Sequence, residues 1–174
     1  MPCGAALGVV LANHLGDGEG GADRMVGVID KYIGDSVMAV WGGLSRMDDH
    51  ADHAVRAALA IARVIREDNA TRRGAGQPLI RVRIGLHSGP VVVGNIGAPG
   101  RVNFTVVGDT VNIAQRFEQL GKEFMAPDEE VVVLASGGTL AAVKHREALG
   151  LGPVAPVLRH VKGHDEPVEA YRLA

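Results

Sequence analysis

Aromatic side chains are scarce in this sequence, at 3% of 174 residues. Proteins that stack nucleic-acid bases need several exposed rings, so this class of binding surface is poorly supplied here. The formal net charge is −2, and the sequence has no dense run of Lys or Arg. Polyanion binding is therefore not the expected main task, and we expect no nucleic-acid partner.

Cysteine is also nearly absent. Cys3 is the only one, which excludes an intrachain disulfide and a cysteine-based zinc site. A single cysteine fits a reducing compartment, and we expect a cytoplasmic protein. The apolar run in residues 1–12 lacks a basic leader and is too short to span a bilayer. We interpret it as neither a signal peptide nor a membrane anchor.

Hydrophobic residues make up 47% of the chain, which is enough for one domain with a substantial core. Glycine and charged residues dominate residues 16–21, a composition typical of a flexible loop. We therefore predict a flexible N-terminal segment at residues 1–21 and one ordered domain at residues 22–174.

The stretch from Val28 to Gly42 predicts a β-hairpin. Apolar strands flank Gly34-Asp35, and Gly-Asp is turn chemistry because glycine adopts positive φ without steric cost. Asp35 at the tip could bind a metal ion, and Lys31 lies four residues before it. Taken alone, a turn aspartate is more often structural than a metal ligand.

Further patterns predict three helices and several strands. An amphipathic helix is expected from about Ala51 to Asn69, a capped helix from Asp109 to about Leu120, and a short helix over residues 139–147. Strands are expected near residues 80–86, 91–97, 102–107, 130–134, 157–162 and 168–173. The predicted fold class is α+β, with an antiparallel or mixed sheet and helices packed on one face.

The helix that begins at Asp109 has two distinct faces. Ile113 and Phe117 lie on an apolar stripe, whereas Asn112 and Arg116, four residues apart, share a polar one. An amide beside a guanidinium could hold a ribose and a phosphate, since arginine grips phosphate oxygens with a planar fork. An ordinary solvated face is the alternative from this helix alone.

Three stretches, residues 30–42, 83–97 and 106–116, resemble in order and spacing the catalytic domain of class III adenylyl/guanylyl cyclases. Residues 161–163 and 168–172 look like the C-terminal end of that family. The resemblance implies a ferredoxin-like sheet and a head-to-tail dimer with nucleotide sites in its interface. It also implies two divalent metal ions, Mg²⁺ or Mn²⁺, which promote attack of the ribose 3′-oxygen on the α-phosphorus and release of pyrophosphate.

The same resemblance assigns roles to single residues. Asp35 matches one of two metal-binding aspartates, Asn112 the ribose-orienting position and Arg116 the position that stabilises the charged phosphorus. Lys162 matches a lysine that contacts the terminal phosphates. Lys31 and Thr105 match the two base-reading positions.

A lysine with threonine in these positions resembles the adenine-reading version of the family. The resemblance therefore implies that ATP is the substrate. Adenine accepts a hydrogen bond at N1 and donates one from N6, whereas guanine inverts this pattern.

The second metal-binding aspartate of the family lies on a strand at the domain start. Only 34 residues precede Asp35, and none matches that segment, since Asp17 and Asp23 lie in unsuitable surroundings. We therefore expect a cyclase domain that lacks its first strand.

Three interpretations remain open. The sequence is a truncated adenylate cyclase, or an impaired domain that dimerises or binds nucleotide with a complete cyclase domain, or a structural module without nucleotide. The full set of purine, ribose and phosphate residues argues against the third.

Overall fold

The computed structural model describes residues 4–12, 28–33, 36–43, 47–98, 101–159 and 167–174. Its first elements are β1 (Gly4–Ala12), β2 (Val28–Ile33), β3 (Ser36–Trp41), α1 (His50–Gly74), β4 (Val82–Pro90), β5 (Val92–Ala98) and β6 (Arg101–Val107). They are followed by α2 (Asp109–Phe124), β7 (Val131–Ser136), α3 (Gly137–Ala142), the 3-10 helix η2 (Glu147–Leu149), β8 (Val157–Arg159) and β9 (Val168–Arg172).

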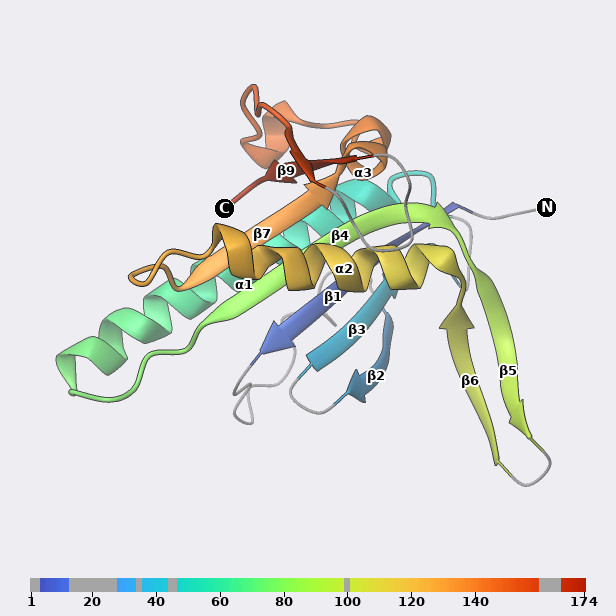
Figure 1. Cartoon of the computed structure of the whole chain (residues 1–174), viewed down its shortest axis with the longest axis horizontal. Helices are drawn as coiled ribbons and strands as arrows, with labels where there is room; N and C mark the ends of the chain where they lie inside the picture. The colour runs from blue at the N-terminus through green and yellow to red at the C-terminus, as the bar shows by residue number, and fades with distance from the viewer. Residues whose placement is uncertain (1–3, 13–27, 34–35, 44–46, 99–100, 160–166) are drawn as a thin grey trace.

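Seven strands form one mixed sheet in the order β2-β3-β1-β4-β7-β9-β8. The β4–β7 pair is parallel, and the neighbouring pairs are antiparallel. The partial order β4-β1-β3-β2, with α1 between β3 and β4 in sequence, is that of a ferredoxin-like sheet. β5 and β6 form a separate two-stranded hairpin that projects away from the main sheet (Figure 1). The predicted α+β class with a mixed sheet is confirmed.

Two predictions are wrong for residues 4–12: that the domain lacks its first strand, and that residues 1–21 form a flexible segment. These residues form β1, which pairs with β3 on one side and β4 on the other. Glycine-rich sequence beyond β1 suggested a flexible segment, whereas the apolar run itself has the composition of a strand in the middle of a sheet. Both α1 and α2 contact β1, so the helices cover this central strand from two sides.

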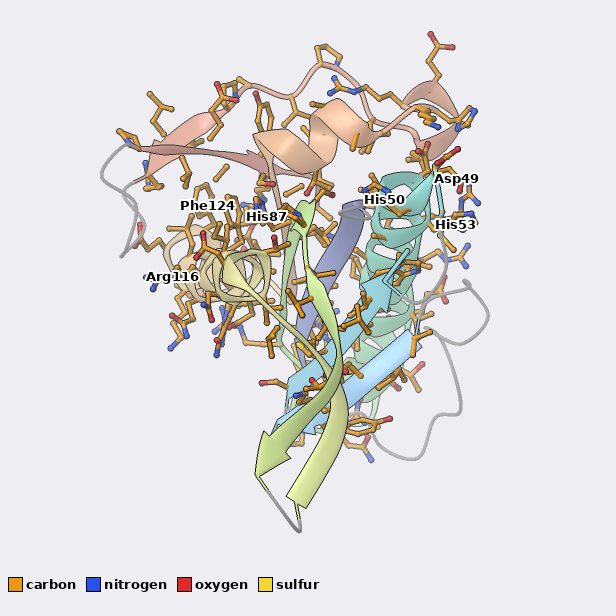
Figure 2. The ribbon with its side chains drawn as sticks, turned by 90° about the vertical axis from the view of Figure 1, so that its right-hand side faces the viewer. Asp49, His50, His53, His87, Arg116 and Phe124 are labelled. Carbon is orange, nitrogen blue, oxygen red and sulfur yellow. The ribbon has the colours of Figure 1, made fainter. Side chains whose placement is uncertain are left out.

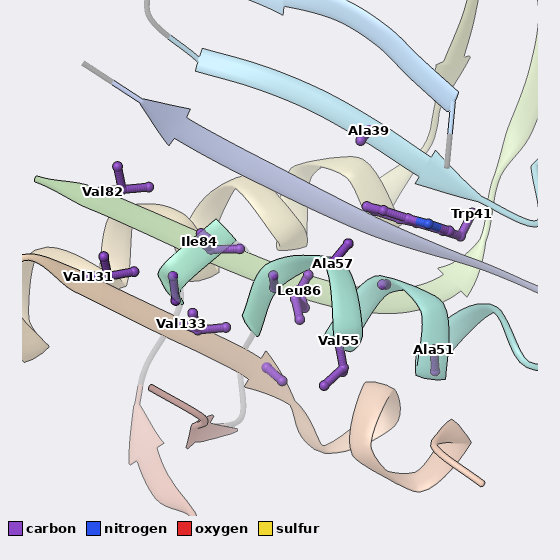
Figure 3. Close-up of a cluster of buried hydrophobic side chains, with 14 of the residues drawn as sticks. Ala39, Trp41, Ala51, Val55, Ala57, Val82, Ile84, Leu86, Val131 and Val133 are labelled. Atoms are coloured by element: carbon purple, nitrogen blue, oxygen red, sulfur yellow. The ribbon is translucent and has the colours of Figure 1, made fainter. Parts of the chain in front are cut away.

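One face of the sheet packs on α1. Val82, Ile84 and Leu86 alternate along β4 and, with Val131 and Val133 of β7, form a buried cluster with α1 (Figure 3). The contacting face of α1 consists largely of small side chains, which allow the helix to approach the sheet closely: Ala51, Ala54, Ala57, Ala58 and Ala62. This apolar stripe confirms the amphipathic helix, although α1 extends to Gly74 rather than ending near Asn69.

The prediction that the helices pack on one face is also wrong. Phe117 of α2 packs against Val132 and Leu134 of β7, which point away from α1. Gly85 of β4 permits close contact, because a Cβ atom there would collide with the backbone of α2. All six residues of β7 are buried, as expected for a strand covered on both faces.

Candidate functional site

An open pocket of about 510 Å³ lies where β6 leads into α2. Lys31 of β2, Val106 of β6 and Asn112 of α2 line it, with Gly108 at the junction. Gly108 has a φ of 139°, a conformation that side-chain-bearing residues rarely adopt. The turn therefore brings the first turn of α2 against the end of β6, so that residues distant in sequence face one space.

The two predicted base-reading residues meet at a third side chain. Thr105 Oγ1 donates a hydrogen bond to Asp30 Oδ2 over 2.8 Å, and Lys31 Nζ lies 3.3 Å from the same oxygen. The side chain of Asp30 is 7% exposed, whereas that of Lys31 is 39% exposed. Lys31 and Thr105 are thus brought together by a buried carboxylate that the sequence patterns did not single out.

A β-bulge places Asp30 in this position. Ile29 pairs with Ala39 of β3, but Lys31 already pairs with Met38, so β2 contains one extra residue at Asp30. Bulges redirect side chains that regular alternation would point to opposite faces. The sequence contained one hint, a carboxylate directly before Lys31 in a largely apolar strand, but the register shift itself depends on the pairing with β3.

The polar face of α2 matches the prediction. Asn112 is exposed and Arg116 is half-buried, and both lie on one side of the helix. Figure 2 shows Arg116 at the outer side of α2, away from the sheet. Neither side chain has a hydrogen bond or ion pair with the residues that the structure describes. Their polar groups are therefore available for a ligand.

Buried polar contacts fix α2 against the sheet. Arg83 Nε of β4 lies 2.9 Å from Glu118 Oε1, and His87 of β4 stacks on Phe117 with 6.3 Å between ring centroids. The Nδ1 atom of His87 is also 2.8 Å from Ser136 Oγ at the end of β7. These contacts hold the helix that carries Asn112, and they keep its polar face turned outward.

Two further predicted site residues, Asp35 and Lys162, lie outside the described ranges. Their neighbours still bear on the metal site, because Ile33 and Leu11 both pair with Ser36, the residue after Asp35. The last residues of β1, Leu11 and Ala12, contain no carboxylate. Within the described residues there is no group of three or more His, Cys, Asp or Glu side chains that could hold a metal ion. These residues do not fit a two-metal site.

The histidines at the start of α1 have structural partners. His50 Nδ1 is 3.1 Å from the carbonyl oxygen of Met47, and His53 Nε2 is 3.2 Å from Asp49 Oδ2 (Figure 2). Both contacts lie at the first turn of α1 and stabilise its start. Of the helices that the structure describes, none combines the length and apolar character needed to cross a membrane.

The chain is similar in sequence to known proteins. Adenylate cyclase 1 of Rhizobium meliloti is 41% identical over 118 residues, which are 68% of this chain and 17% of that protein. Adenylate cyclase of Anabaena cylindrica is 33% identical over 155 residues, 87% of this chain and 29% of that protein. The chain thus spans less than a third of the length of these relatives.

The fold likeness extends over the whole chain. The crystal structure of the adenylyl cyclase CyaB from P. aeruginosa superposes with a TM-score of 0.78 at 22% identity, covering 100% of this chain and 95% of that one. The family described as "Adenylate and Guanylate cyclase catalytic domain" matches residues 24–135, which is more than half of the chain. This chain belongs to the adenylate and guanylate cyclase catalytic domain family.

Proposed function

We propose that this domain binds ATP and supplies the nucleotide-reading half of an adenylate cyclase site, which converts ATP to 3′,5′-cyclic AMP and pyrophosphate at a dimer interface. One observation carries the proposal. Lys31 and Thr105 share the carboxylate of Asp30, and Lys31 lines the same pocket as Asn112. The proposed base-reading Lys31 and the proposed ribose-orienting Asn112 therefore line one pocket, and Thr105 is joined to Lys31 through Asp30.

The base preference follows from donors and acceptors. The ammonium group of Lys31 donates to N1 of adenine, and the hydroxyl oxygen of Thr105 accepts from the N6 amino group. Guanine presents an acceptor at O6 and a donor at N1, so both contacts would be mismatched. A mismatch of buried polar groups discriminates strongly because the groups lose water without gaining a partner.

The ribose and phosphates engage α2. Asn112 holds the ribose so that its 3′-oxygen faces the α-phosphorus, and Arg116 stabilises the negative charge that develops on the phosphate oxygens. The 3′-oxygen forms the new bond to phosphorus as the bond to the pyrophosphate leaving group breaks, and the proton of the 3′-hydroxyl is released to solvent. Lys162, by its match to the family, would bind the terminal phosphates.

A second cyclase domain completes the site, either as a homodimer or as a heterodimer with a complete domain. Exposed apolar side chains support association: Val92 and Val107 on the β5–β6 hairpin, and Val28 and Tyr32 on the edge strand β2. Tyr32 is 70% exposed. Apolar groups gathered on a projecting hairpin and a sheet edge favour contact with another chain.

The second candidate function is a regulatory partner without catalysis of its own. The carboxylate-free end of β1 beside Ser36 favours it, because two divalent ions held by Asp35 alone would lack charge and ligands. In this case the domain binds nucleotide or dimerises, and the partner domain supplies the complete metal site.

Activity of the chain alone tests these functions. With ATP and Mn²⁺ we expect weak cyclic AMP formation or none, measured by chromatography of the products. Clear turnover that Asp35→Ala abolishes would contradict the impaired state and show that another group replaces the second carboxylate. Absence of ATP binding by the folded chain would overturn the proposed function itself.

A further inference from the structure

We propose that Asp30 is a positioning residue that sets the base preference of this site. It accepts the hydroxyl proton of Thr105, so that Thr105 can only accept a hydrogen bond from a ligand, and it holds the ammonium group of Lys31, a donor, beside it. The inference rests on the proposed function and extends it to a residue that does not touch the nucleotide.

The first step concerns the bulge in β2. The pairing of β2 with β3 contains one extra residue, Asp30. This bulge directs the side chain of Asp30 to Thr105 on β6. Asp30 Oδ2 then accepts a hydrogen bond from Thr105 Oγ1 over 2.8 Å and forms an ion pair with Lys31 Nζ at 3.3 Å. A regular strand would point consecutive side chains to opposite faces, so the bulge makes this shared contact possible.

The second step concerns the single hydroxyl proton of Thr105. A carboxylate has acceptors only, and a threonine hydroxyl has one proton. Because that proton is donated to Asp30, Thr105 can offer a ligand only its lone pairs. Thr105 therefore accepts from an amino group such as N6 of adenine, and it cannot donate to the O6 atom of guanine or hypoxanthine.

The third step concerns the ammonium group of Lys31, which Asp30 holds in place. It has three protons, and the contact with Asp30 uses one direction while the side chain remains 39% exposed toward the pocket. The carboxylate thus holds a flexible side chain in place before the base arrives. Such preorganisation reduces the entropy lost on binding.

A purely structural function of Asp30 makes a different prediction. Asp30 also links the main sheet to the β5–β6 hairpin through Thr105. If that link were its whole contribution, Asp30→Asn would weaken binding of all purine nucleotides by the same factor. The ratio between nucleotides separates the two explanations.

The experiment compares ATP, GTP and inosine triphosphate as competitors of a fluorescent ATP analogue on the full chain. Inosine triphosphate differs from ATP in the pattern at positions 1 and 6 of the base. We expect the wild-type chain to prefer ATP, and Asp30→Asn to reduce the ATP to inosine triphosphate preference by about tenfold, since an amide can donate as well as accept and no longer fixes the hydroxyl proton. Thr105→Val should reduce the preference similarly, whereas Thr105→Ser, which retains the hydroxyl, should keep it.

Asp128→Asn is the matched control, because Asp128 is an exposed aspartate in the loop after α2, and it should keep the preference. An unchanged ratio in folded Asp30→Asn, with wild-type preference for ATP intact, overturns the inference about Asp30 alone. If Asp30→Asn does not fold, an unchanged ratio in Thr105→Val overturns it instead. Absence of binding of any nucleotide to the wild-type chain overturns both this inference and the proposed function.

Discussion

Arg83 and Glu118 form a buried ion pair between β4 and α2, with 2.9 Å between Nε and Oε1 and only 1% exposure of the Glu118 side chain. Removing one partner of a buried pair costs more stability than the intact pair contributes, because the remaining charge stays buried without its ion pair. The pair therefore ties the position of α2, and with it the polar face that carries Asn112 and Arg116, to the central sheet.

The first prediction concerns this pair. Arg83→Ala should lower the free energy of unfolding by about 3 kcal/mol, because the buried carboxylate of Glu118 loses its ion pair with Arg83. Urea unfolding of Arg83→Ala, Glu118→Gln and the double variant measures the coupling in a double-mutant cycle. Strictly additive effects of the two substitutions would show that the pair does not contribute as a unit.

The close contact at Gly85 gives the second prediction. Gly85→Ala should lower the free energy of unfolding by about 1–3 kcal/mol, because the new methyl group collides with the backbone of α2. Gly94→Ala is the matched strand control, since a Cβ atom at Gly94 meets nothing within 4 Å. Equal unfolding midpoints for the two variants would contradict the packing of α2 on β4.

The third prediction concerns Asp52, a buried aspartate at the start of α1. Burial raises the pKa of its carboxyl, but hydrogen bonds from the backbone N–H groups of Lys144 and His145 and from the His145 ring lower the pKa by more. The net pKa is below that of the unfolded chain, about 3.9. The stabilisation is therefore complete above this value and disappears as the pH falls through the folded pKa.

Asp52→Asn tests this dependence. At pH 7 the substitution should reduce the free energy of unfolding by about 1–3 kcal/mol, because charge-assisted bonds to two backbone groups are weakened. The difference from wild type should shrink as the pH is lowered below about 4. Urea unfolding at pH 7 and pH 3 measures both values. A difference that stays constant between these conditions would mean that the Asp52 charge contributes nothing.

The fourth prediction concerns Arg116. In a catalytically competent dimer, Arg116→Ala should lower kcat by about a hundredfold or more with a smaller change in KM, because the proposed function uses the guanidinium mainly in the transition state. Arg116→Lys should restore little, since an ammonium lacks the planar fork. Lys122→Ala is the control, because Lys122 is an exposed cation on the same helix. A similar loss in Lys122→Ala would indicate a general charge effect.

Motifs in the sequence identify the candidate site residues, but they do not contain the geometry that joins these residues. Lys31, Thr105, Asn112 and Arg116 follow from linear patterns and a family resemblance, and the stripe on α2 follows from helical spacing. Asp30 was missed because its position depends on a bulge, and a bulge depends on which β3 residues pair with β2. Single-sequence patterns do not contain that register.

The sheet was predicted in class but not in its layers. β1 was missed because the glycine-rich sequence after it suggested a flexible segment, and its pairing with β3 and β4 involves residues far along the chain. Coverage of both faces was missed although β7, with no polar alternation, contained the signal. The close approach of α2 at Gly85 depends on tertiary contact and has no local signature.

The most direct test is complementation. The chain is mixed with a complete homologous cyclase domain in which the residues equivalent to Asn112 and Arg116 are replaced by alanine, and cyclic AMP formation from ATP is measured. The proposed half-site predicts that the mixture forms cyclic AMP well above the sum of the separate components, and that Asn112→Ala in this chain abolishes the gain. Activity no greater than that sum, from a mixture in which the two domains demonstrably associate, would contradict the account.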